Sequence, residues 1–241
     1  MALSRNRLDR FISQQLNISR RDVRLMLAQK RICVDDCIAK NIEQIVDTFS
    51  VITVDNHVIQ NNTPHYIMLN KPIGVVSATK DEQHKTVIDL LNDSGNFTPQ
   101  LVEELHIVGR LDLNSSGLLL LTNDSRLSSF LTSPDNKVIK KYRVTLANQL
   151  SKGYIDAFEK GMYFSFENIT TKPAKLIIVS DNVAEVYLSE GRYHQIKRMF
   201  GRFRNPVVKL HRMSIGSLSL DESLSSGQSR QLSKEEVKGM M

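Results

Sequence analysis

An arginine and an aspartate two positions apart stand in a segment that could support chemistry. Arg110 and Asp112 follow Gly109, and residues 115–117, which we expect to form a turn, lead into the apolar run Leu118–Leu121. If the segment is extended, both charged side chains point the same way, and a guanidinium favours the ionised form of a nearby carboxylate. The pattern suits a carboxylate nucleophile between apolar anchors. It equally fits a surface ion pair beside a buried strand.

Three further segments carry groups that could act with this aspartate. Lys140–Leu146 alternates like a strand and places Tyr142 on a face with apolar residues, which also fits a core tyrosine. Ser189–Met199 has a glycine turn followed by basic residues. The apolar residues of His194–Phe203 fall at helical spacing, and Val208–Arg212 completes the set.

Positive charge is concentrated in two windows. The net charge is +6, yet Arg5–Arg31 holds eight bases and two acids, and Arg192–Arg212 holds seven bases and no acid. Concentrated positive potential is what a polyphosphate partner requires. We therefore expect nucleic-acid binding, the alternative being two solvated helix faces. A DNA-binding function is less well supported, because the sequence has no helix-turn-helix pattern with a long recognition helix.

The first sixty residues predict a compact α-α-β unit. One helix has its apolar face at Leu8–Leu16. A second helix starts at Ser19, with Asp22 as its capping-box partner, and carries three arginines on solvent-facing positions. The β-branched stretches Arg31–Asp35 and Val51–Asp55 predict strands.

The remainder predicts a larger domain. Residues 61–65 are polar and contain a proline, which is typical of a linker, so we expect one domain over 7–60 and another over 66–241. Strands dominate the larger domain without a repeated βαβ period, which favours an α+β fold with a mostly antiparallel mixed sheet. We expect a helix over Ser151–Lys160 with Ser151 as N-cap, and fraying from Ser229 onward.

The N-terminal pattern resembles the alpha-L RNA-binding fold, a small domain first described in a small-subunit ribosomal protein. The resemblance rests on Arg7–Ile12, Ser19–Asp22 and Lys30–Asp36. It implies that a set of basic side chains contacts RNA phosphates, which would position the protein without reading sequence. These are Arg20, Arg21, Arg24, Lys30 and Arg31.

The four chemistry-bearing segments, taken in order, resemble the pseudouridine synthases that modify ribosomal RNA. The resemblance spans Arg7 to about Val237. Its opening residues and the stretch Tyr66–Gly74 are most similar to members that act on 16S RNA of the small subunit. Relatives acting on large-subunit RNA share the catalytic motifs, so the large subunit is the alternative substrate. A non-catalytic RNA-binding assembly factor is the second alternative.

The resemblance implies a role for each site residue. Asp112 would be the nucleophile or base at the target ribose, Tyr142 would stack on the flipped base, and Lys197 would pair with the aspartate. Arg110 would help to hold the flipped-out backbone. The remaining substrate-binding candidates in this domain are Leu210, Arg192 and Arg198.

Isomerisation of uridine requires no cofactor, and the sequence shows no phosphate-binding or dinucleotide-binding glycine motif. Cys33 and Cys37 lack the further ligands of a zinc site, so we expect small packing residues, buried or half-buried, and no metal. Two cysteines indicate a reducing compartment, taken as the cytoplasm. With no apolar run long enough for a membrane span, we expect a monomer whose partner is ribosomal RNA or an assembly intermediate of a ribosomal subunit.

Overall fold

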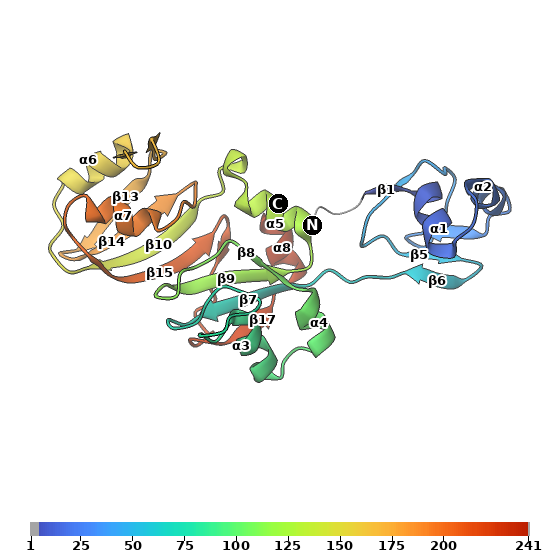
Figure 1. Cartoon of the computed structure of the whole chain (residues 1–241), viewed down its shortest axis with the longest axis horizontal. Helices are drawn as coiled ribbons and strands as arrows, with labels where there is room; N and C mark the ends of the chain where they lie inside the picture. The colour runs from blue at the N-terminus through green and yellow to red at the C-terminus, as the bar shows by residue number, and fades with distance from the viewer. Residues whose placement is uncertain (1–4, 241) are drawn as a thin grey trace. The chain divides into compact units, whose positions relative to one another are not determined.

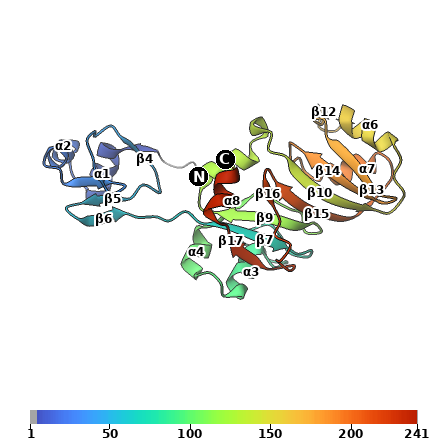
Figure 2. The same ribbon diagram turned by 180° about the vertical axis from the view of Figure 1, so that it is seen from behind.

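The computed structural model describes residues 5–240, so that residues 1–4 and position 241, the end of the expected larger domain, lie outside the described residues. Backbone contacts divide the chain into two compact units (Figures 1 and 2). Unit 1 comprises the chain up to Pro64 together with Asp124–Arg126, and unit 2 comprises His65–Asn123 and the chain from Leu127 onward. No helix in the described part of the chain is long and apolar enough to cross a membrane.

Unit 1 begins with two short amphipathic helices, α1 (Leu8–Leu16) and α2 (Arg20–Ala28). Asn17, in the left-handed conformation, ends α1. The predicted capping box forms at α2, where the Ser19 and Asp22 side chains each bond the other's backbone amide. Leu8, Ile12 and Val23 are fully buried in a common core, so the apolar spacing predicted the packed faces correctly.

A small antiparallel sheet completes the core of unit 1. In the described residues it has the order β3-β2-β5-β6, and β1 (Asn6–Arg7) pairs separately with β4 (Ile45–Val46). Its strands are β2 (Ile32–Val34), β3 (Cys37–Ile38), β5 (Ile52–Val54) and β6 (His57–Gln60). Cys33 is half-buried as expected, but Cys37 is exposed because it lies on the edge strand β3.

Unit 2 is built on a nine-stranded mixed sheet, counted over the described residues. Its main path is β13-β14-β10-β15-β9-β7-β17, with β8 paired to β9 and β16 paired to β15 (Figures 1 and 2). Every pairing is antiparallel except that of β15 with β9, which agrees with the predicted class. The strands are β7 (Tyr66–Lys71), β8 (His106–Val108), β9 (Ser116–Thr122), β10 (Lys140–Leu146), β13 (Lys175–Ser180), β14 (Val183–Leu188), β15 (Val207–Ile215), β16 (Leu218–Ser219) and β17 (Ser229–Gln231).

Alternation along β7 and β9 divides the interior of unit 2 into two cores. Leu119 and Leu121 belong to one core and Leu118 and Leu120 to the other, as expected when successive side chains point to opposite faces of a sheet. Helices α3 (Val87–Ser94), α4 (Pro99–Glu104), α6 (Gly153–Lys160) and α7 (Gln195–Gly201) pack on the first core. Helices α5 (Ser125–Thr132) and α8 (Lys234–Met240) pack on the second.

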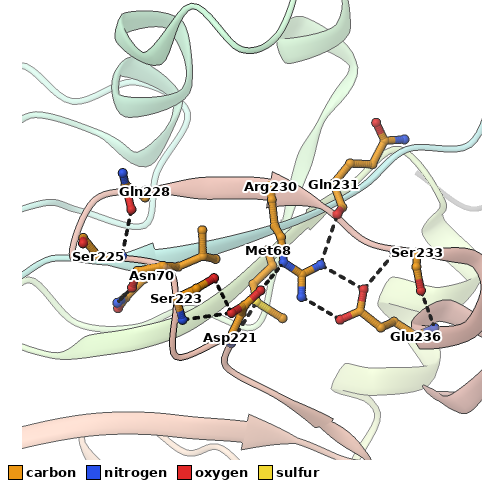
Figure 3. A network of polar contacts seen from close by, with 11 residues as sticks. Met68, Asn70, Asp221, Ser223, Ser225, Gln228, Arg230, Gln231, Ser233 and Glu236 are labelled. Carbon is orange, nitrogen blue, oxygen red and sulfur yellow. Dashed lines mark hydrogen bonds and ion pairs between the residues drawn. The ribbon is translucent and has the colours of Figure 1, made fainter.

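The C-terminal segment is ordered, so the expectation of fraying from Ser229 was wrong. Strand β17 pairs with β7, and Figure 3 shows Arg230 between the carboxylates of Asp221 and Glu236. Hydrogen bonds from Ser223 and then from Arg230 lower the pKa of Asp221 to about 2. The polar composition of this segment reflects a network of ion pairs.

Two smaller expectations also need correction. Helix α6 begins at Gly153 after Lys152, which makes no side-chain capping bond, so Ser151 is not the N-cap. The turn expected at residues 115–117 instead falls on Leu113 and Asn114, and β9 already begins at Ser116. The leucine run of β9 is buried as predicted.

Candidate active site

The loop that carries Asp112 joins β8 to β9 and is shaped by backbone contacts. Gly109 adopts a φ of 67° at a bend, and residues 110–115 form no strand. The Ser77 hydroxyl donates to the Leu111 carbonyl at 2.8 Å and accepts from the Leu111 amide at 3.1 Å. The Gly74 amide donates to Leu113. These bonds hold the backbone on both sides of Asp112.

A buried lysine holds the backbone of the same loop. Lys71, at the end of β7, is fully buried, and its Nζ donates to the carbonyls of Ser115 at 2.8 Å, Pro72 at 2.9 Å and Asp112 at 3.2 Å. Burial lowers the pKa of Lys71 from 10.5 to about 8, although the charge of Asp112 opposes the shift. The ammonium therefore fixes the backbone of the aspartate without touching its carboxylate.

The Asp112 carboxylate faces two cationic or potentially cationic side chains from the start of α7. Lys197 Nζ donates to Asp112 Oδ2 at 3.0 Å, and His194 Nε2 lies 3.4 Å from the same oxygen. His194 adopts a φ of 48° and immediately precedes the helix. Among the described residues, these two are the ionic partners of Asp112. The Lys197–Asp112 pair implied by the resemblance is therefore present, whereas Arg110 forms no ion pair with Asp112 in the described residues.

Tyr142 provides an aromatic wall beside this pair. It lies on β10 between Val186 of β14 and Arg212 of β15 and is 9% exposed. Leu210, on β15, is also buried. Tyr142 belongs to the first core and lines the pocket as well, so the two interpretations of this residue are compatible.

A single pocket collects most of the predicted site residues. Its lining includes Arg110, Asp112, Tyr142, Arg192, Lys197 and Leu210. Arg198 is placed elsewhere: it forms an ion pair with Glu167 and lies over the Phe164 ring at 4.2 Å from the ring centre. Its guanidinium is committed within the protein, so the pocket does not use it.

The loop before α7 is held by one buried carboxylate. Glu190 is 5% exposed and accepts from the Lys172 amide, from the Gln195 side chain and from Arg192 Nε. The Gln195 side chain in turn accepts from the Arg192 amide. This network fixes the approach to α7 and hence the positions of His194 and Lys197.

The N-terminal cations divide into paired and unpaired groups. Arg20, with Arg7, contacts the buried Asp9, and Arg31 pairs with Asp55. Burial alone would raise the pKa of Asp9, but hydrogen bonds from the two arginines hold it below its usual value. Among the described residues, Arg21, Arg24 and Lys30 are exposed and have no ionic partner.

Sequence reasoning missed three supporting groups: Lys71, Ser77 and His194. A lysine at the end of an apolar strand, directly before Pro72, was the available signal for Lys71. Ser77 had no such signal, because its contact with Leu111 spans 34 positions. His194 approaches Asp112 from a left-handed backbone conformation, which spacing in the sequence does not reveal.

The comparisons with known proteins agree on one family. Residues 65–201 match the family described as RNA pseudouridylate synthase. The chain is 43% identical to the ribosomal small subunit pseudouridine synthase A of Pseudomonas aeruginosa, covering 96% of this chain and 98% of that protein. It is 38% identical to the protein of that name from Escherichia coli, with the same coverage. A crystal structure of a pseudouridylate synthase superposes with a TM-score of 0.70 at 36% identity, covering 98% of this chain and 99% of that one.

Proposed function

The chain belongs to the RNA pseudouridylate synthase family, and we propose that it converts one uridine of 16S small-subunit ribosomal RNA to pseudouridine. The small-subunit assignment draws on the names of relatives that align over nearly their whole length. The observation that carries the catalytic part is the Asp112–Lys197 ion pair in a pocket walled by Tyr142.

The reaction is an isomerisation. The bond between N1 of uracil and C1′ of ribose breaks, the base turns, and a bond forms between C5 and C1′. The C5 proton is lost and N1 gains one, so the atoms balance without a co-reactant. The protein must therefore supply a nucleophile or general base, a pocket that holds the detached uracil, and exclusion of water.

Asp112 is suited to act at C1′ or the ribose as nucleophile or base. Lys197 Nζ donates a hydrogen bond to its Oδ2 at 3.0 Å, which orients the carboxylate and places a positive charge beside it. Lys71 fixes the backbone of the aspartate and so limits its movement. We assign the chemical step to Asp112, with Lys197 as its charge partner.

The uracil has to leave its stack, which costs a few kcal/mol. Stacking on an aromatic ring returns about 1–3 kcal/mol, and the Tyr142 ring is the aromatic surface that lines the pocket. Leu210 supplies an apolar contact to the base. Arg110 is exposed at the same pocket and is suited to hold the displaced backbone.

Unit 1 is proposed to bind RNA phosphates as an alpha-L domain over residues 7–60, with residues 66–241 as the catalytic domain and 61–65 as the linker. The exposed cations Arg21, Arg24 and Lys30 support this role. Ribosomal RNA, alone or in an assembly intermediate, is the proposed partner. We further propose a cytoplasmic monomer.

The test is to incubate purified protein with unmodified 16S and 23S ribosomal RNA separately and to map pseudouridine chemically. A single new pseudouridine in 16S RNA is the expected result. A product in 23S RNA alone would overturn the small-subunit assignment. Binding to 16S RNA without product, on naked RNA and on partly assembled subunits, would favour a non-catalytic assembly factor.

A further inference from the structure

A second hollow adjoins the pocket that contains Asp112. The two share Arg110, Tyr142, Gly191 and Arg192 as lining residues. We call the second one the basic hollow, because five of its lining side chains are basic and one is acidic. The basic residues are Arg110, Lys140, Lys172, Arg192 and Arg212, and the acidic residue is Glu190.

The carboxylate of the basic hollow does not balance this charge. Glu190 is buried and already accepts hydrogen bonds from Arg192, Gln195 and the Lys172 backbone. Within the described part of the chain, Lys140 and Arg110 form no ion pair. The hollow therefore retains an excess of positive charge that the protein itself leaves uncompensated.

Lys140 stands on the same face of β10 as Tyr142. The two residues are two apart, and their pairing with Leu188 and Val186 of β14 is regular. Lys140 is half-buried, and burial, together with the charge of Arg212, lowers its pKa. A bound anion would offset both effects, because an opposite charge nearby favours the protonated ammonium.

Arg212 is positioned to contribute a second donor. It is 3% exposed, and its Nε and Nη2 donate to the carbonyls of Leu118 at 2.7 Å and Gly109 at 3.0 Å. Its Nη1 has no acceptor among the described residues. A guanidinium fixed by two backbone carbonyls requires little further ordering to bind an anion.

We propose that the basic hollow binds one of the two RNA backbone phosphates that flank the target uridine, with Lys140 and Arg212 as donors to its oxygens. The proposal rests on the proposed function, because the shared wall places this phosphate next to a nucleotide in the Asp112 pocket. A phosphodiester fits the chemistry: it is anionic and presents two free oxygens to charged N–H donors. A phosphate held there would anchor the strand while the neighbouring base is displaced.

The experiment combines a protein variant with a neutral phosphate. A 16S RNA is assembled by splinted ligation from a synthetic segment in which each flanking phosphate in turn is an uncharged methylphosphonate. The Kd of each RNA is measured for the wild type, Lys140→Met and Lys140→Arg. Lys141→Met is the matched control, since the neighbouring Lys141 pairs with Glu185 and lines a different hollow.

At one of the two positions, the methylphosphonate is expected to raise the wild-type Kd by about 10-fold, the scale of a charge-assisted hydrogen bond. Lys140→Met should raise the Kd for unsubstituted RNA by a similar factor, with no further loss on the substituted RNA. Lys140→Arg should restore affinity, and Lys141→Met should leave the methylphosphonate effect intact.

If the loss of affinity from Lys140→Met and the loss from the methylphosphonate multiply at both positions, the two changes act independently and the phosphate site is overturned. Wild-type affinity of Lys140→Met for unsubstituted RNA would overturn it as well. Circular dichroism of Lys140→Met and Lys140→Arg identifies a folding defect. If a variant is misfolded, the wild-type Kd still tests the site, because a Kd that the methylphosphonate leaves unchanged at both positions overturns it. If the wild type binds but forms no pseudouridine in unsubstituted RNA, the proposed function fails, while the binding comparison still decides the phosphate site.

Discussion

Lys197 Nζ lies 3.0 Å from Asp112 Oδ2, although the two residues are 85 positions apart in the chain. Each is anchored separately: Asp112 by the Lys71 ammonium beneath its loop, and Lys197 by helix α7, which follows the Glu190 network. Both side chains remain partly exposed to the pocket, at 31% and 28%. The ion pair is thus built from two rigid supports and is open to a substrate.

Removal of the ammonium should slow the chemical step. Lys197→Met leaves Asp112 without its closest cation, and loss of one electrostatic contact to a reacting group costs about 10²–10³-fold in rate. Lys197→Arg should recover part of the loss because it retains the charge. Single-turnover rates at saturating protein provide the measurement, with the exposed Lys160 replaced by Met as control. A wild-type rate in Lys197→Met would show that the ion pair is not needed.

Lys71 should give unit 2 a characteristic dependence of stability on pH. Because its pKa is lowered from 10.5 to about 8 in the folded protein, the unfolded chain binds more protons between these values. The free energy of unfolding contributed by this group therefore rises as the pH rises through this window, and the burial cost is present in full below about pH 8. Lys71→Met should remove this contribution and leave a smaller slope.

Urea unfolding at pH 7.5, 8.5 and 9.5 measures this slope in the wild type and in Lys71→Met. Tyrosine fluorescence reports on unit 2, because the chain has no tryptophan and its six tyrosines lie beyond residue 65. Identical slopes for the two proteins would exclude Lys71 as the titrating group. The variant should also lose activity, since three backbone carbonyls around the Asp112 loop lose their donor.

The unpaired N-terminal cations should dominate RNA affinity in unit 1. Each phosphate contact that is removed should reduce the slope of log affinity against log salt by about 0.7–0.9. Arg21→Ala and Arg24→Ala should show this reduction, whereas Arg31→Ala should show less, because Arg31 is committed to Asp55. Titrations at several salt concentrations compare the three. Equal effects would contradict the division into paired and unpaired cations.

The elements of unit 1 could be predicted from sequence because their signals are local. The apolar spacing of α1 and the Ser19–Asp22 capping box each lie within a few residues. The same holds for strand β10, whose alternation marks its buried face. The ordered C-terminal segment could not be predicted, since Arg230 gains its order from Asp221 and Glu236 through the folded sheet.

The composition of the pocket and its central ion pair were predictable, but the other contacts of Asp112 were not. The resemblance to pseudouridine synthases implied that Asp112, Tyr142 and Lys197 act at one site, and the structure brings them to one pocket. The other surroundings of Asp112 depend on the loop after Gly109 and on where α7 begins. Neither the absence of an Arg110 ion pair nor the approach of His194 therefore follows from spacing. The ion pair of Arg198 with Glu167 likewise joins α7 to the turn between two paired strands, β11 (Tyr163–Phe164) and β12 (Ile169–Thr170), 31 positions away.

The most direct measurement is pseudouridine formation by Asp112→Asn on unmodified 16S RNA under single-turnover conditions, with RNA affinity measured in parallel. Asparagine keeps the shape of the side chain and removes its charge, so the variant should bind RNA as the wild type does and form no pseudouridine. Product formed at the wild-type rate would contradict the assignment of the chemical step to this carboxylate.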